Sequence, residues 1–162
     1  MRTITIKVYE YNELTDKAKA RARDWYLEGV FDYGWWENIY EDAANVGIKI
    51  TSFDSYHAEG SIITSAPEVI EDIRANHGKT CNTYKIATIH EPIFQELEAS
   101  RDKDDETFED RFIVAEANFL REILAAYHKI LDDEENYMQS NEYLEAGILG
   151  NEYEFDVSGG NV

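Results

Sequence analysis

Three residues that can bind metal ions follow one another at moderate spacing: His77, Cys81 and His90. A structural zinc site uses such side chains, but it needs four ligands, usually including paired cysteines. The chain has one cysteine, and His90-Glu91 lacks the second histidine that completes the zinc-protease pattern. We therefore expect no metal and no cofactor. The three residues are interpreted as a helix-end histidine, a small buried thiol and a surface histidine.

Other motifs that carry chemistry are incomplete. The run 102–106 resembles the start of a calcium loop, but Thr107 stands where the loop needs glycine and Ile113 where it needs glutamate. The scattered glycines form no phosphate-binding loop, and no nucleophile elbow is present. Carboxylates are so numerous that pairing any two as acid and base has no specificity. No residue is assigned a catalytic role, and we predict that the protein is not an enzyme.

Charge is the most informative property of the chain. It has 34 acidic and 15 basic residues, a net charge of −19 and a pI near 4.4. Residues 1–90 contribute −4 and residues 91–162 contribute −15. This field repels nucleic acids, anionic membranes and phosphates, and it attracts basic surfaces. We expect the acidic residues to form one face, which a basic protein partner would bind without direct contact with nucleic acid.

Two acidic groups stand out at the ends of a long amphipathic segment, residues 108–131. They are the candidate partner-binding residues, together with two adjacent tryptophans: Asp102, Asp104, Asp105, Glu106, Glu109 and Asp110; Asp132, Asp133, Glu134 and Glu135; Trp35 and Trp36. The helix dipole favours acids at a helix N-terminus, which accounts for the first group as capping. The second group has no such explanation unless Asp132 or Asp133 caps the following helix.

Carboxylate spacing suggests DNA mimicry. Side chains three or four positions apart on a helix lie about 5–6 Å apart. Duplex DNA carries one charge per about 1.7 Å of axis, counting both strands. A helix edged with acids can therefore imitate one phosphate strand for a DNA-binding protein. Trp35 and Trp36 are added because adjacent residues on a helix cannot both face one core.

Periodicity predicts an α+β fold, an antiparallel sheet of about four strands with helices on one face. Period-two alternation indicates strands at 3–9, 48–53, 59–64 and 152–157, the middle two forming a hairpin. The apolar supply suits one domain over residues 1–162, with a frayed tail at 158–162. The chain has no long apolar run and no possible disulfide, which favours a cytoplasmic protein.

Apolar spacing and capping residues predict the helices. Thr15 caps a helix that runs to Glu28, and Ser65 caps a helix that ends near His77. A helical region at 79–100 is expected to break or restart at Pro92. The remaining predicted helices span residues 35–46, 108–131 and 137–145.

Three segments resemble a family of small uncharacterised acidic bacteriophage and prophage proteins. They are Tyr11–Tyr26, Trp35–Ala43 and Asn151–Phe155. The resemblance spans most of the chain in outline and carries no catalytic residues. By association, it implies an inhibitor of host defence of the DNA-mimicking anti-CRISPR or antirestriction type, acting in the host cytoplasm.

The leading hypothesis is therefore a non-enzymatic phage-type inhibitor that binds a basic, nucleic-acid-binding surface of a host defence protein. The first alternative is an antitoxin-like or regulatory module that binds through an apolar and aromatic surface. The second is an enzyme acting on a nucleotide or signal molecule, which would need a local basic pocket from residues such as Lys17, Arg21 and Arg74.

Overall fold

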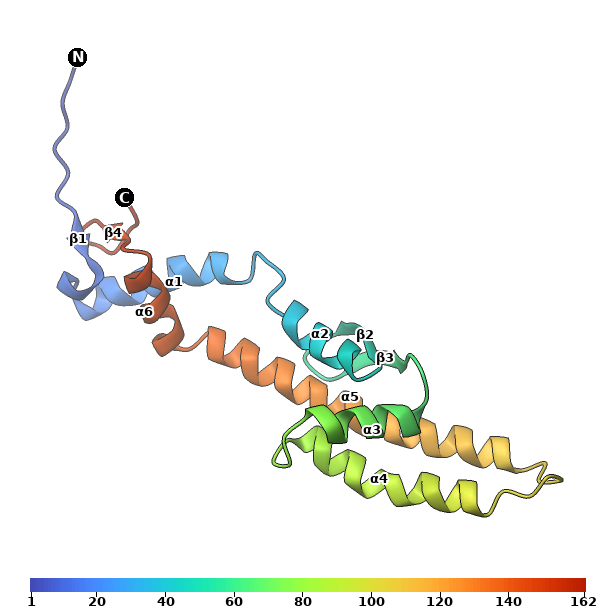
Figure 1. The fold of residues 1–162 in the computed structure, drawn as a ribbon. Helices are drawn as coiled ribbons and strands as arrows, with labels where there is room; N and C mark the ends of the chain where they lie inside the picture. The colour runs from blue at the N-terminus through green and yellow to red at the C-terminus, as the bar shows by residue number, and fades with distance from the viewer. The chain divides into compact units, whose positions relative to one another are not determined.

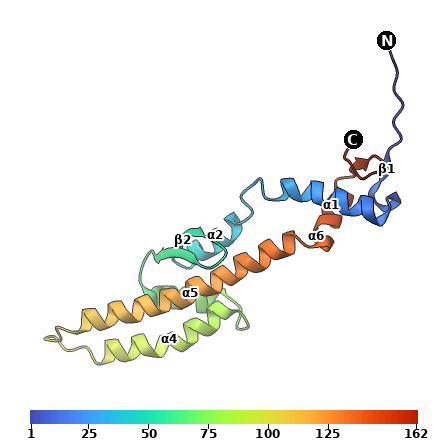
Figure 2. The same cartoon turned by 180° about the vertical axis from the view of Figure 1, so that it is seen from behind.

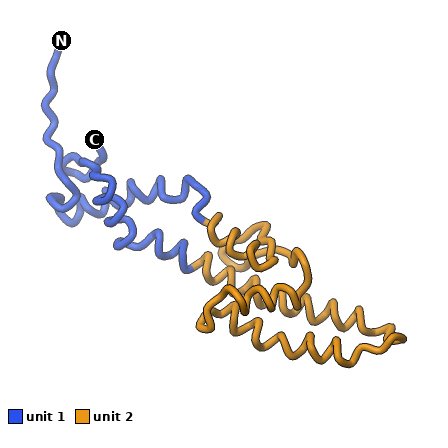
Figure 3. The backbone as a smooth tube through the Cα atoms, in the orientation of Figure 1, with its two compact units in different colours: residues 1–35, 133–162 blue, residues 36–132 orange.

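The computed structural model describes all 162 residues, which form six α-helices, one 3-10 helix and four short strands (Figures 1 and 2). The α+β class is confirmed. The chain divides into two compact units (Figure 3). Unit 1 comprises residues 1–35 and 133–162, and unit 2 comprises residues 36–132. None of the six helices combines the length and the apolar character required of a membrane-spanning helix.

Unit 2 contains the larger core. Helix α2 (Glu37–Asn45) leads into the hairpin β2 (Ile48–Phe53) and β3 (Ala58–Ile62), which is antiparallel as predicted. Helices α3 (Ala66–Asn76) and α4 (Asn82–Ala99) follow. Helix α5 (Phe108–Met138) then runs back along α4 and contributes its residues up to Asp132 to this unit (Figure 1).

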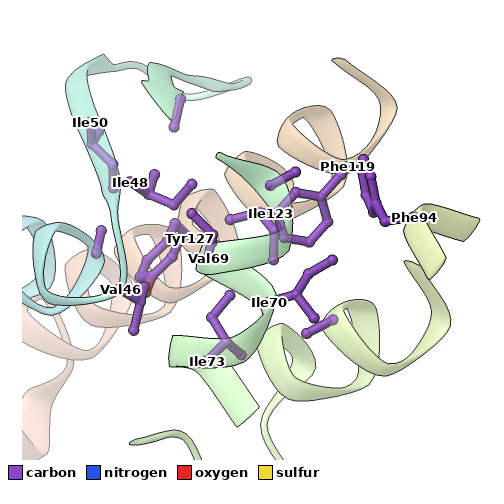
Figure 4. Packing of buried hydrophobic residues seen from close by; sticks show 14 residues of the cluster. Val46, Ile48, Ile50, Val69, Ile70, Ile73, Phe94, Phe119, Ile123 and Tyr127 are labelled. Carbon is purple, nitrogen blue, oxygen red and sulfur yellow. The ribbon is translucent and has the colours of Figure 1, made fainter. Parts of the chain in front are cut away.

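The core of unit 2 is built on one stripe of α5. Phe119, Ile123 and Tyr127 recur every four residues and are fully buried, because positions four apart share a helix face. They meet Ile48 of the hairpin and Ile73 of α3 (Figure 4). The amphipathic pattern predicted for residues 108–131 is confirmed, and the helix continues seven residues further, to Met138.

Unit 1 packs α1 (Asp16–Val30) against α6 (Asn141–Gly150). Thr15 caps α1 as predicted, since its hydroxyl accepts a hydrogen bond from the Ala18 amide. Strand β1 (Tyr9–Glu10) continues into the 3-10 helix η1 (Tyr11–Glu13) and pairs with β4 (Glu154–Phe155). The Trp25 ring packs edge-on against Phe155, 5.8 Å between centroids, and closes this smaller core.

The predicted four-stranded sheet is wrong. The strands form two separate two-stranded sheets, β1–β4 and β2–β3. The strand expected at 152–157 stops at Phe155, because Asp156 starts a tight turn in which its amide donates to the Gly160 carbonyl. Residues 3–8 of the strand expected at 3–9 consequently have no partner, and only Tyr9 and Glu10 pair with β4.

The tail at 158–162 is held in place rather than frayed. Asn161 forms a β-bridge with Phe155, and the Val162 amide donates to the Glu154 carbonyl. Gly159 is buried against α1, with a left-handed φ of 85°. A side chain there would place its Cβ 2.1 Å from the Ala18 carbonyl oxygen, so this contact requires glycine.

Several helices also differ from the prediction. Helix α1 ends at Val30 rather than at Glu28, and α2 spans Glu37–Asn45 rather than residues 35–46. Helix α4 runs through Pro92 without a break. Pro92 lacks the amide that would donate a hydrogen bond to the Thr88 carbonyl. Because both residues are exposed, water can donate to that carbonyl instead. Ser140, not Asp132 or Asp133, caps α6, which spans Asn141–Gly150 rather than the predicted 137–145.

Candidate interaction surface

The first acidic group, which we call the loop acids, lies where α4 turns into α5. Its six members occupy the connection between the helices and the first turn of α5: Asp102, Asp104, Asp105, Glu106, Glu109 and Asp110. Five of the six are exposed, and Asp105 is half-buried. Residues 101–111 hold six acids and three bases, a net charge of −3.

Asp105 has a structural role at this turn. Its Oδ1 accepts hydrogen bonds from the Thr107 amide at 3.0 Å and the Thr107 hydroxyl at 2.8 Å, just before α5 begins. Its other carboxylate oxygen pairs with Arg111. The hydroxyl of Thr107, with the neighbouring amide and guanidinium, holds the pKa of Asp105 below its ordinary value. Asp105 is therefore occupied within the chain, and the other five loop acids face solvent.

The second acidic group lies inside α5 rather than beyond it. Asp132, Asp133, Glu134 and Glu135 are consecutive on the helix, where each residue turns by about 100° from the last. Four consecutive side chains therefore spread around the axis and form no single face. Asp132 is 22 positions after Asp110, about 33 Å along the helix.

The row of carboxylates expected along α5 is interrupted between its ends. Glu116 accepts a hydrogen bond from the Ala66 amide, 3.1 Å away, at the start of α3. Glu122 contacts the ring of His90 on α4. Both carboxylates thus join helices of unit 2, and the other acids of α5 lie near its two ends, at Glu109 and Asp110 and at Asp132–Glu135.

The two tryptophans pack into separate clusters. Trp35 lies 6.2 Å from Phe31 in unit 1, and Trp36 lies 6.2 Å from Phe53 in unit 2, both measured between ring centroids. Both side chains are half-buried. Trp36 is the residue before α2, so the pair marks the junction of the two units. Neither tryptophan lies on a helix, so the helical argument that singled them out does not apply, and each ring packs against a phenylalanine of its own unit.

A groove that the sequence did not reveal lies beside the loop acids. It has a volume of about 560 Å³ and is formed by α3, α4 and α5. Its floor is apolar, because Ile70 and Phe94 are buried and Phe112 packs on Phe94 with centroids 5.5 Å apart. Phe112 follows the loop acids by less than one turn of α5. We call this feature the acid-rimmed groove.

Three carboxylates and one guanidinium line the groove: Glu71, Glu91, Glu98 and Arg74. Arg74 pairs with Glu91 and lies 5.9 Å above the Tyr84 ring, so Glu91 is compensated. Glu98 is 3.8 Å from Arg101, whose guanidinium stacks 4.4 Å above the Phe108 ring. Glu71 has no basic partner. The rim therefore carries net negative charge over an apolar floor.

The residues considered for metal binding do not converge. His90 is buried rather than exposed and packs 5.4 Å from Phe119, whereas Cys81 is exposed rather than buried. The Nδ1 of His77 lies 2.6 Å from the Thr83 hydroxyl. No group of three or more histidine, cysteine or acidic side chains is arranged to hold a metal ion.

Two of the three basic side chains considered for a nucleotide pocket, Arg21 and Arg74, are engaged locally. Arg21 hydrogen bonds to the Ser158 hydroxyl in unit 1, and Arg74 pairs with Glu91 in unit 2. Arg23 bonds both the Tyr11 hydroxyl at 2.8 Å and Glu145 at 3.1 Å. These arginines stabilise the fold through their neighbours.

Comparisons with protein-family models, curated proteins and solved structures find no match to this chain.

Proposed function

We propose that the protein is a non-enzymatic inhibitor that binds a basic, nucleic-acid-binding surface of a host defence protein. The observation that carries the proposal is the clustering of exposed loop acids next to the acid-rimmed groove in unit 2. Unit 2 holds 20 acidic and 9 basic residues, a net charge of −11. In this account the protein acts as a DNA mimic of the anti-CRISPR or antirestriction type in the host cytoplasm.

The negative charge of unit 2 supports this function, because it would raise the rate of association with a basic partner and favour basic partners over others. A basic surface that binds phosphates is drawn to any dense array of carboxylates, and such steering accelerates association at low ionic strength. The five exposed loop acids provide that array on a short, locally constrained turn. The Asp105–Arg111 ion pair joins this turn to the first turns of α5, which favours an ordered array.

The acid-rimmed groove offers a site in which a partner side chain can be buried, which a charged surface patch lacks. Interfaces draw most of their affinity from a few anchors that become fully desolvated, while exposed charge pairs at the rim contribute little. The apolar floor of Ile70, Phe94 and Phe112 would receive such an anchor from the partner. An arginine or lysine on an apolar stem fits this setting, because its stem covers the floor and its charge reaches Glu71 or Glu98.

The same floor favours a second candidate function, an antitoxin-like or regulatory module that binds an apolar segment of a partner. The two functions differ in their response to salt. Binding through carboxylates should weaken steeply as ionic strength rises, whereas apolar docking should not.

The test is affinity capture from bacterial lysate with mass spectrometry of the captured proteins. Capture by the native chain is compared with a variant in which Asp102, Asp104, Glu109 and Asp110 are changed to lysine. Asp105 is left intact because it holds the turn. We expect this loop-acid variant to lose the partner.

A matched control carries four lysines at exposed acids of unit 1: Asp24, Glu28, Asp32 and Glu152. Each change of acid to lysine adds two charges, so both variants shift from −19 to −11. The control should retain the partner. Unchanged capture by the loop-acid variant would end the proposal, and equal loss by both variants would reduce it to a general effect of net charge.

A further inference from the structure

Residues 3–8 have the pattern of a strand and form none. Thr3, Thr5 and Lys7 alternate with apolar Ile4, Ile6 and Val8. The three apolar side chains are 81%, 59% and 41% exposed. Figures 1 and 2 both draw this segment extending away from the β1–β4 pair. An alternating, β-branched segment with unpaired backbone is a template for another strand.

The chain supplies no partner for this segment. Strand β1 has β4 on one side, and no strand pairs with its other edge. Strand β4 cannot lengthen to follow residues 3–8, because the Asp156 carboxylate accepts the amides of Ser158 and Gly160 and closes a turn. The far side of Phe155 is taken by Asn161. A partner for residues 3–8 must come from outside the chain.

The charge of residues 1–8 indicates what kind of strand can pair with them. Residues 1–8 contain Arg2 and Lys7 and no acid, in a chain of net charge −19. Glu10 follows on the same face as Arg2, since residues separated by an even number share a strand face. A strand with a base at one end and an acid at the other is complementary to itself when two copies run antiparallel.

We propose that residues 2–10 of two copies pair antiparallel about a two-fold axis through Ile6. In this register Ile6 lies opposite Ile6 of the second copy, and Ile4 lies opposite Val8. Arg2 lies opposite Glu10 at both ends. Cross-strand apolar pairs and opposite charges both stabilise a ladder. Two-fold pairing through the same surface is the commonest form of self-association.

Neighbouring registers are less favourable. A shift that centres the pair on Lys7 sets two lysines directly opposite, which is destabilising. A shift that centres it on Thr5 leaves Glu10 beyond the paired region. A half-step between these positions turns the apolar faces of the two copies to opposite sides. Only the Ile6-centred register satisfies charge and face together.

The proposed pairing would also join the two β1–β4 pairs into one four-stranded sheet. A two-stranded ribbon is marginal in water, whereas three or more strands are needed for independent stability. Here each β1 already pairs with its own β4. The assembly has the strand order β4–β1–β1–β4, with the two β1 strands at the centre.

Disulfide cross-linking tests the register. Each variant carries Cys81→Ser to remove the exposed native thiol, plus Ile4→Cys, Ile6→Cys or Val8→Cys. Directly opposite Cα atoms lie about 4.5–5.5 Å apart, within the reach of a disulfide. Ile6→Cys should cross-link with itself under mild oxidation. Ile4→Cys should cross-link with Val8→Cys but not with itself, because its own copy lies about 13 Å along the strand.

Sedimentation of the native chain and of Ile6→Pro tests the association itself. Proline removes an amide and breaks the ladder, yet residues 3–8 are exposed and lie outside both cores, so the fold should be unchanged by circular dichroism. We expect the native chain to dimerise reversibly and Ile6→Pro to raise the dissociation constant by at least about tenfold.

Three results would overturn the proposal. One is a native chain that stays monomeric at every concentration tested. Another is a dimer that survives Ile6→Pro unchanged, which would place the contact elsewhere. The third is equal self-cross-linking of the three cysteine variants, which would indicate random collision. None of these results depends on the acid-rimmed groove.

Discussion

The buried hydroxyl of Tyr127 on α5 donates a hydrogen bond to Oδ2 of Asp42 on α2, 3.0 Å away. The same carboxylate oxygen lies 3.5 Å from Nε2 of His77, the residue that follows α3. Burial, together with the charge of Asp42, raises the pKa of Tyr127, so the hydroxyl keeps its proton and remains a donor. The Asp42 carboxylate on α2 thus contacts side chains from α5 and from the end of α3 beside the core of unit 2.

Tyr127→Phe should lower the free energy of unfolding by about 1–2 kcal/mol, because the hydrogen bond is lost from a fully buried site. Chemical denaturation at neutral pH measures this difference. Tyr40→Phe is the control, since the half-buried Tyr40 hydroxyl makes no hydrogen bond within the chain. A Tyr127→Phe variant as stable as the control would show that the contact with Asp42 contributes nothing.

Ile123→Ala should cost about 2–5 kcal/mol of stability, because it removes methyl groups from a fully buried position and leaves a cavity. Ile113→Ala lies on the same helix at a side chain that is 57% exposed, and it should change stability by less than about 0.5 kcal/mol. Thermal or denaturant unfolding compares the two. Similar costs at both positions would contradict the assigned inner face of α5.

Gly159→Ala should destabilise unit 1. Its φ of 85° disfavours a side chain, and the new Cβ would meet the Ala18 carbonyl oxygen at 2.1 Å. Gly150→Ala is the matched control, because no atom lies within 4 Å of its added Cβ and alanine favours the helix. Proteolysis of the last residues should accelerate in Gly159→Ala only. Equal protection in both variants would mean that the tail does not dock on α1.

Asp156→Asn should weaken unit 1 at neutral pH more than at acidic pH. The Ser158 hydroxyl, with the Gly160 and Ser158 amides, holds the pKa of Asp156 below its ordinary value of about 3.9. A carboxylate with a lowered pKa contributes stability above that ordinary value, and the contribution is lost as the pH falls through the lowered pKa.

Melting temperatures between pH 7 and pH 2 test this. The native chain should melt higher than Asp156→Asn at pH 7, and the two should converge near pH 2. Asp24→Asn, at an exposed carboxylate of α1, should follow the native chain throughout. A gap between the native chain and Asp156→Asn that persists at pH 2 would exclude ionisation as its cause.

Local patterns predicted the helices well. The four-residue recurrence of Phe119, Ile123 and Tyr127 identified α5, and the hydroxyls of Thr15 and Ser65 identified where α1 and α3 begin. Periodicity and capping are properties of neighbouring residues, so one sequence is enough to read them. The extension of α5 to Met138 was missed because the acids at 132–135 suggest an end to the helix.

Local sequence patterns could not predict the pairing of the strands or the acid-rimmed groove. Whether residues 3–9 pair depends on a turn at Asp156, which lies 147 positions after Tyr9, and no local pattern indicates that turn. The groove takes Ile70, Phe94 and Phe112 from three helices, and each residue alone looks like ordinary core. The loop acids were visible in the sequence, but the contacts of Asp105 with Thr107 and Arg111 depend on how the turn before α5 folds.

The most direct test of the proposed function is competition between the protein and duplex DNA for the captured partner. Immobilised protein is loaded with the purified partner, and duplex DNA of increasing concentration is added at fixed ionic strength. We predict that DNA releases the partner from the native chain. In the reverse measurement, the native chain and the unit 1 control variant should both block the partner from binding DNA. The loop-acid variant should fail to block it. A stable complex containing protein, partner and DNA together would contradict the account, because a mimic and its original cannot occupy one surface at once.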